Sequence, residues 1–166
     1  HSYACGKPYL RVLPVDVTRA ADFQGIEEQF DTAIMLNVLE HVPDEGAALR
    51  HLRAALVPGG RAVILVPHHP SLYGTLDTAL EHRERYTFDK LRQSLEDAGF
   101  AVEQLFDFNR VSVPGWWING KLLRRRTFSR VQIKLLDALM PVLKRIDRFW
   151  PWTGLSVIAI ARKPAP

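Results

Sequence analysis

The residues best suited to chemistry follow an apolar run that stops abruptly at Asn37, with Glu40 and His41 close behind. A helical pattern comes next, then Pro58-Gly59-Gly60 and a second apolar run over 62–66. Two buried strands joined by a helix are typical of a crossover unit in a parallel sheet. Ligands of such sheets bind outside the carboxyl ends of the strands. The segment from Asn37 to His41 is therefore the leading candidate for a functional site.

His41 is the best candidate for a general base, and Glu40 and His82 are the other candidates for proton transfer. An imidazole titrates near neutral pH. A positioned base that takes a proton from the nucleophile typically accelerates a reaction by about 10²–10⁴-fold. The alternative is that His41 only caps or packs at the strand–helix junction, and the sequence leaves both interpretations open.

The elements that would position these residues follow from the periodicity of the apolar residues. Two helices are expected to begin after the N-caps Asp44 and Thr87, and the second to end before Gly99. Residues 68–80 are expected to form a loop. Strands are expected over 10–15, 30–36, 61–66, 100–108 and 155–161.

This order predicts an α/β fold, a Rossmann-like, doubly wound and mainly parallel sheet in one domain over 1–166. A helical insertion or lid is expected over 109–151, before the last strand. It should contain two amphipathic segments separated by Pro141.

Composition excludes several classes of protein. With 166 residues, of which 47% are hydrophobic and 24% charged, the chain has the size and core material of one folded domain. Cys5 is the only cysteine, so the chain holds neither an internal disulfide nor a cysteine-based zinc site. The single cysteine weakly favours a reducing compartment, and the cytoplasm is the expected location.

The net charge of +4 is concentrated in one segment, 120–150. That segment carries nine basic residues against Asp137 and Asp147, a local net charge of +7, while the remainder carries −3. Its apolar residues repeat at helical spacing, as in a packed lid helix or in a helix lying on an anionic membrane. The lid is the preferred interpretation and peripheral membrane contact the alternative. Nucleic-acid binding is not expected, because no reading motif accompanies the charge.

Histidines also follow the second apolar run, at His68 and His69, and His82 lies beside Glu81. Their spacing matches no compact metal motif. No metal ion is therefore expected.

The order of motifs resembles the C-terminal two-thirds of a class I S-adenosylmethionine-dependent methyltransferase. The motifs are Val15-Asp16-Val17-Thr18, Phe30-Asp31 through Glu40-His41-Val42, Leu56-Val57-Pro58-Gly59-Gly60, His82-Arg83-x-x-Tyr86, Leu95 through Ala98-Gly99-Phe100, and Ser156 to Lys163. A further segment, Gly115-Trp116-Trp117-x-Asn119-Gly120-Lys121, is similar to a subgroup found beside glycosyltransferase domains.

The resemblance implies methyl transfer from S-adenosyl-L-methionine to a small-molecule or glycan-type acceptor. It implies that Asp16 contacts the adenine amino group with Val17 beside it, and that Asn37, Val38 and Leu39 flank the methionine portion. Residues expected at the substrate opening or its lid are His68, Arg83, Tyr86, Trp116 and Trp117.

One departure from the family pattern matters. The glycine-rich loop after the family's first strand, and the acidic residue that ends its second strand, do not occur here. The family's strand order is 3-2-1-4-5-7-6, so about 40–60 residues, one βαβ unit or slightly more, are expected before His1. Otherwise a second chain, as in a dimer, or residues 10–15 must pair with the exposed strand edge.

As a fragment, the chain is predicted to be catalytically inactive alone. Two other functions stay open. One is a non-catalytic methyltransferase remnant that acts in assembly, and the other is a peripheral membrane-binding module built on 120–150.

Overall fold

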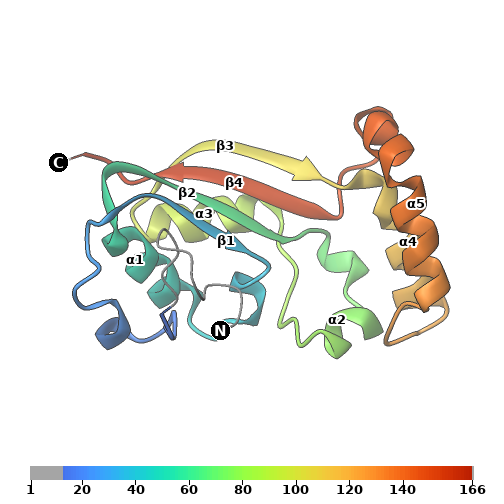
Figure 1. Cartoon of the computed structure of the whole chain (residues 1–166), viewed down its shortest axis with the longest axis horizontal. Coiled ribbons are helices and arrows are strands. Elements are labelled where there is room, and N and C mark those ends of the chain that lie inside the picture. The colour runs from blue at the N-terminus through green and yellow to red at the C-terminus, as the bar shows by residue number, and fades with distance from the viewer. Residues whose placement is uncertain (1–12, 166) are drawn as a thin grey trace, which may run out of the picture.

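The computed structural model describes residues 13–165 and contains one four-stranded sheet (Figure 1). The strands lie in the order β1-β2-β4-β3. β2 pairs parallel with β1 and antiparallel with β4, which is also antiparallel to β3, so three strands share one direction. The strands are β1 (Phe30–Leu36), β2 (Leu56–Pro67), β3 (Ala101–Phe108) and β4 (Ser156–Arg162). This arrangement corresponds to strands 4-5-7-6 of the predicted order.

Two helices, α1 (Glu45–Ala55) and α3 (Phe88–Asp97), cover one face of the sheet (Figure 1). As predicted, the Asp44 side chain accepts a hydrogen bond from the backbone N–H of Ala47, and Thr87 caps α3 in the same way. Gly99 follows α3 with φ +85°, a conformation that favours glycine.

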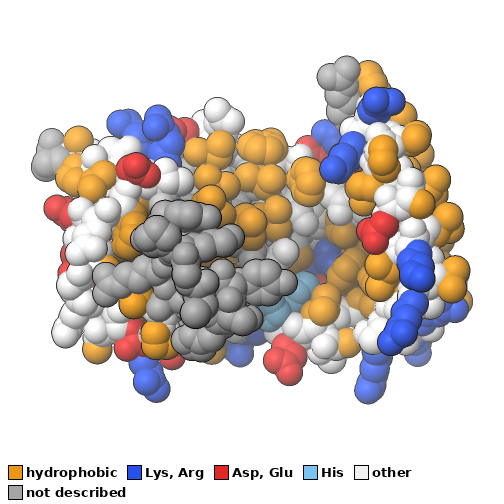
Figure 2. Space-filling view, in the orientation of Figure 1, with side chains coloured by type: hydrophobic (Ala, Val, Ile, Leu, Met, Phe, Trp, Pro, Cys, Tyr) orange, Lys and Arg blue, Asp and Glu red, His pale blue; other side chains and the backbone are white. Residues whose placement is uncertain are grey.

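The core lies between this face and the two helices. Alternate residues of the central strands, such as Ile64 and Val157, are fully buried there with Leu49 and Leu91 of the helices. The opposite face is apolar and open, with Ile34, Leu36, Phe106 and Phe108 exposed. Figure 2 shows hydrophobic side chains gathered over the strands.

The predicted strand over 10–15 is wrong in its described part. Residues 13–15 are not in a strand, and residues 10–12 lie outside the described range. Pro14 has no N–H to offer a neighbouring strand, and Asp16 immediately starts a hydrogen-bonded turn with Thr18.

β2 begins five residues earlier than expected, at Leu56, and includes Pro58-Gly59-Gly60. Gly59 donates its N–H to the carbonyl of Lys163, so the glycine pair at the start of β2 is held beside the end of β4. A Cβ on Gly60 would lie 2.9 Å from the carbonyl oxygen of Val57, so the close backbone approach requires glycine here.

The predicted loop over 68–80 contains a short helix, α2 (Thr75–Ala79), and the 3₁₀ turn Pro70–Leu72. Other 3₁₀ turns span Ala20–Phe23, Leu39–His41, Arg110–Ser112 and Asp147–Phe149.

The insertion before β4 is helical, with α4 (Val113–Trp117), a π-helical turn over Ile118–Leu122, and α5 (Arg130–Ile146). Pro141 lies inside α5 and does not divide it, contrary to expectation. A proline leaves the carbonyl four residues earlier without its helical donor, and α5 tolerates this because it is exposed enough for water to satisfy the carbonyl. No helix within residues 13–165 is long and apolar enough to cross a membrane.

Candidate active site

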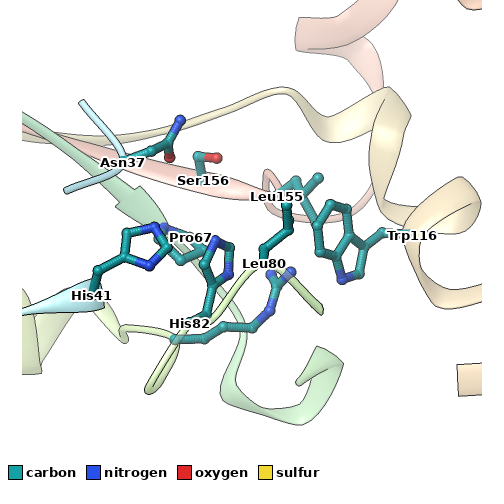
Figure 3. Close-up of a pocket in the computed structure, with 9 residues that line it drawn as sticks. Asn37, His41, Pro67, Leu80, His82, Trp116, Leu155 and Ser156 are labelled. Atoms are coloured by element: carbon teal, nitrogen blue, oxygen red, sulfur yellow. The ribbon is translucent and has the colours of Figure 1, made fainter. Parts of the chain in front are cut away.

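A cavity of about 360 Å³ lies at the carboxyl ends of β1 and β2, where the sequence placed the site (Figure 3). It receives residues from both parallel strands, from the segment around α2, from α4 and from the start of β4. Its lining residues are Asn37, His41, Pro67, Leu80, His82, Arg85, Trp116, Leu155 and Ser156.

The turn after β1 places the first of these side chains. Asn37 adopts the left-handed conformation with φ 50°, which asparagine tolerates better than most residues. Its N–H still donates to the carbonyl of Leu65 on β2, so the turn stays joined to the sheet. The chain then closes the 3₁₀ turn Leu39–His41, which points His41 into the cavity.

His41 and His82 form a pair, with ring centroids 5.0 Å apart in an edge-on arrangement (Figure 3). Nδ1 of His41 lies 3.1 Å from the carbonyl oxygen of Glu81, and Nδ1 of His82 lies 3.0 Å from Oδ1 of Asp77. Both partners only accept hydrogen bonds, so each Nδ1 carries a proton. In the neutral rings, each Nε2 therefore has a free lone pair.

Glu40 lies beside this pair and is completely buried. Its Oε1 is 3.9 Å from Nε2 of His82, and neither carboxylate oxygen accepts a hydrogen bond from another described residue. Burial raises the pKa of the Glu40 carboxyl above its ordinary value.

Asp77 of α2 holds the other side of the cluster together. It accepts hydrogen bonds from Nε of Arg85 at 2.7 Å, from the backbone of Gly74 at 3.0 Å and from Nε1 of Trp116 at 3.3 Å. Burial works to raise the pKa of Asp77, but the hydrogen bond from His82 and the charge of Arg85 outweigh it and hold the pKa low. Arg85 lies 4.7 Å above the Trp116 ring, so this network joins α4 to the sheet edge.

The structure thus brings together Asn37, Glu40, His41, His82 and Trp116 from the predicted set. The other predicted residues lie outside the cavity lining.

Val38 and Leu39 pack against or within the core, so any cofactor contact there falls to the backbone. The Asp16 carboxylate accepts hydrogen bonds from the N–H and the hydroxyl of Thr18, which lower its pKa. The backbone carbonyl of the next residue, Val17, accepts a hydrogen bond from Nδ1 of His51.

His68 is buried and its Nδ1 hydrogen-bonds the carbonyl of Tyr86 at 2.7 Å. Tyr86 is a core residue whose hydroxyl donates to Glu45. Arg83 borders a separate surface hollow, and Trp117 is half exposed outside the cavity.

Sequence reasoning missed Asp77 and Arg85, the buried ion pair of the site. Asp77 carries the weak signal of an acid three residues after Gly74, where a helix N-terminus favours one. Arg85 carries none, because alternating charges in Glu81-His82-Arg83-Glu84-Arg85 are typical of a solvated loop.

The fold is an α/β domain with a cavity at the carboxyl ends of the parallel strands β1 and β2. Residues 8–105, more than half of the chain, match the family described as a methyltransferase domain. The chain belongs to this family. This match confirms the predicted methyltransferase family, and the solved structures below share the predicted fold.

Solved structures with the same fold include a putative methyltransferase from Bacillus halodurans, at 16% identity and TM-score 0.58, covering 94% of this chain and 78% of that one. A SAM-dependent methyltransferase from Archaeoglobus fulgidus matches at 19% identity and TM-score 0.56, covering 95% of this chain and 70% of that one. The Burkholderia thailandensis 1,6-didemethyltoxoflavin-N1-methyltransferase, with bound 1,6-didemethyltoxoflavin and S-adenosylhomocysteine, matches at 19% identity and TM-score 0.53, covering 93% of this chain and 51% of that one. The chain spans about half of that last protein. No curated protein sequence is significantly similar to this one.

Proposed function

We propose that the chain belongs to an enzyme that transfers the methyl group of S-adenosyl-L-methionine to an oxygen or nitrogen of a small-molecule or glycan-type acceptor. The observation that carries this proposal is the pair His41–His82 with free Nε2 atoms, at the carboxyl edge of a methyltransferase-family sheet. The preference for a glycan-type acceptor rests on the subgroup resemblance of residues 115–121.

The residues present fit one side of the cofactor. The left-handed turn at Asn37 leaves this residue at the cavity, and the methionine portion is proposed to lie beside it and the backbone of 38–39. The cofactor supplies an electrophilic methyl group on a sulfonium ion. The turn and the cavity walls would orient that group and exclude water from it. The glycine-rich loop is not in this sequence, so the opposite wall must come from elsewhere, and we expect this chain alone to be inactive.

The proposed general base is Nε2 of His41 or His82. Both rings are held by hydrogen bonds through Nδ1, so their orientation is fixed before the acceptor binds. Removing the proton from a hydroxyl acceptor is typically worth about 10²–10⁴-fold in rate.

Isothermal titration with S-adenosyl-L-homocysteine tests the proposal. We expect binding by the polypeptide encoded by the whole gene and little or none by residues 1–166. Absence of binding by both would favour the alternative, a methyltransferase-like remnant that acts in assembly. The Asn37→Ala variant of the whole protein should weaken binding, and Asn109→Ala, an asparagine in the same left-handed conformation but outside this cavity, should not.

The free edge of β1 bears on the same question. Within residues 13–165 β1 pairs only with β2, and its other edge has no strand beside it. We propose that further strands of the whole protein pair there, and that two copies of the shorter chain pair there in their absence. Sedimentation velocity of both proteins would separate these arrangements.

A second candidate function is supported by α5, which buries none of its described residues. An ordinary lid helix packs its apolar stripe, but here the stripe is open to solvent. Its exposed apolar residues are Val131, Ile133, Leu135, Leu136, Leu139 and Val142. Together with the local charge of +7, this surface favours contact with an anionic membrane.

Sedimentation with vesicles tests this candidate. Replacing Arg124, Arg125 and Arg126 by alanine should weaken binding to phosphatidylserine vesicles by about 1 kcal/mol per residue. Replacing Arg19, Arg50 and Arg92 changes the net charge equally and should have little effect. Equal binding to neutral vesicles would contradict a role for the arginines, and absence of binding to either kind of vesicle would remove the membrane function.

A further inference from the structure

Three electron-pair acceptors converge beside the cavity without a donor between them. They are a carboxylate oxygen of Glu40 and one ring nitrogen each from His41 and His82, and these three atoms lie within 4.8 Å of one another. The nitrogen of His82 nearest Glu40 is Nε2. Glu40 is fully buried, and no other described residue donates a hydrogen bond to its oxygens. Acceptors placed together in this way repel one another unless a cation lies among them.

The charges around the cluster point the same way. Asp77 and Arg85 are both buried and form a direct ion pair, so they neutralise each other. Glu40 then leaves one uncompensated negative charge in a place closed to solvent. A buried charge without a partner is costly, so the site is suited to a positive ligand.

We propose that Glu40, His41 and His82 bind a divalent transition-metal ion, with Zn²⁺ the best match. Two imidazoles and one carboxylate form a known type of zinc ligand set, which leaves a fourth position open. Imidazole ligands disfavour Mg²⁺ and Ca²⁺. His41 and His82 line the cavity, so the open position faces the space where an acceptor would bind.

The surroundings of both histidines support this assignment. A metal-bound histidine usually donates its other N–H to a carboxylate or a backbone carbonyl, which fixes the ring and leaves the metal-binding nitrogen free. His82 donates Nδ1–H to Asp77, and His41 donates Nδ1–H to the carbonyl of Glu81. The 3.9 Å between Nε2 of His82 and Oε1 of Glu40 must shorten to about 3.4 Å for zinc bonds of about 2.0–2.1 Å. The other separations in the cluster, which reach up to 4.8 Å, must shorten as well, so binding requires rotation of these side chains.

The inference goes beyond the proposed methyl transfer and does not depend on it. The sequence predicted no metal, because His82 lies 41 positions beyond His41 and only the fold brings them together. A bound zinc ion promotes loss of a proton from a coordinated hydroxyl. With zinc bound, the two histidines act as ligands and the ion promotes loss of the acceptor's proton. Without zinc, one of the histidines takes that proton as a general base. The metal content of the protein distinguishes these two mechanisms.

The test measures Zn²⁺ binding by the untagged chain after removal of metal with EDTA and dialysis. We expect one ion per chain by mass spectrometry of the metal, and competition with a chromophoric chelator gives the affinity. Glu40→Gln and His82→Asn should each lower the affinity more than about tenfold, since loss of a supporting residue alone costs about 10–100-fold. The matched control is His69→Asn, whose ring bonds Thr153 outside the cluster. It should bind as the unaltered protein does.

Nuclear magnetic resonance of the histidine nitrogens needs no variant. Zn²⁺ should shift the Nε2 signals of two of the six histidines and leave the other four unchanged. Failure to retain zinc, unchanged affinity in folded Glu40→Gln protein, or shifts confined to other histidines would each overturn the proposal. None of these readouts requires S-adenosylmethionine, so their failure is distinguishable from failure of the methyl-transfer proposal.

Discussion

Replacing Asp77 by asparagine should lower the free energy of unfolding of this protein more than any conservative replacement on its surface. Asp77 and Arg85 are buried and joined at 2.7 Å, and the same carboxylate accepts hydrogen bonds from His82 and Gly74. An amide keeps the shape of the side chain but leaves the Arg85 charge without a counterion. Breaking a buried pair in this way costs about 3–5 kcal/mol.

The loss is large compared with the total stability of a domain, about 5–15 kcal/mol. For a chain of this size it corresponds to a fall in melting temperature of about 6–20 °C. Urea unfolding followed by circular dichroism and tryptophan fluorescence measures it. The control is Asp97→Asn, an exposed residue that accepts from Gln93, and it should change stability by less than about 0.5 kcal/mol.

A loss below about 1 kcal/mol for Asp77→Asn would refute the reasoning, since the Arg85 charge would then be satisfied by other means. A second variant isolates the charge itself. In an Arg85→Met background the buried cation is gone, so the further change Asp77→Asn should cost much less than it does in the unaltered protein. Additive losses would show that Asp77 acts through its other hydrogen bonds.

Three further outcomes are expected. The hydrogen bond from Arg110 holds the pKa of Asp107 low, so its stabilisation is present above the ordinary value of 3.8 and lost as the pH falls. Asp107→Asn should therefore cost about 1.5–3 kcal/mol at pH 7 and progressively less as the pH falls below 3.8, by urea unfolding, whereas a cost that does not change with pH would contradict the assignment. Glu40→Gln should raise the melting temperature of the metal-free protein at pH 7 by about 2–4 °C, because a buried unpaired charge is removed. A fall in the melting temperature would show that a stabilising partner of the Glu40 carboxylate had been lost. Gly60→Ala should cost about 1–3 kcal/mol in urea because its Cβ meets backbone oxygens, and Gly115→Ala, with open space, should cost nothing. Equal effects of the two glycine changes would contradict the close approach at Gly60.

The parts of the fold that the sequence predicted well are those specified by local chemistry. Apolar runs and caps such as Asp44 and Thr87 act within a few residues, so the two central strands and both covering helices were found. The strand expected over 10–15 failed because Pro14 and the Asp16 turn outweigh β-propensity in its described part. α5 continues through Pro141, and its solvent exposure lowers the penalty because water can satisfy the carbonyl that loses its helical donor.

The sequence predicted the contiguous part of the site, Asn37 to His41, and the more distant His82 and Trp116. Glu40 and His41 adjoin in sequence at the end of a predicted strand, so position alone made them candidates. Asp77 and Arg85 could not be found in the same way, because burial turns ordinary loop charges into an ion pair and burial of a loop is not encoded by periodicity.

The buried network explains why the histidines matter more together than either does alone. Asp77 fixes the ring of His82, the Glu81 carbonyl fixes that of His41, and Nε2 of His82 lies 3.9 Å from Oε1 of Glu40 in this cluster. A histidine that only capped a helix would not require a second ring, an unpartnered carboxylate and a neutralised arginine around it. The cost of burying Glu40 unpaired is a cost to folding, and it is recovered only if a proton or a cation occupies the cluster. The geometry therefore favours a cluster that binds a positive species, a proton or a metal ion, next to the proposed acceptor.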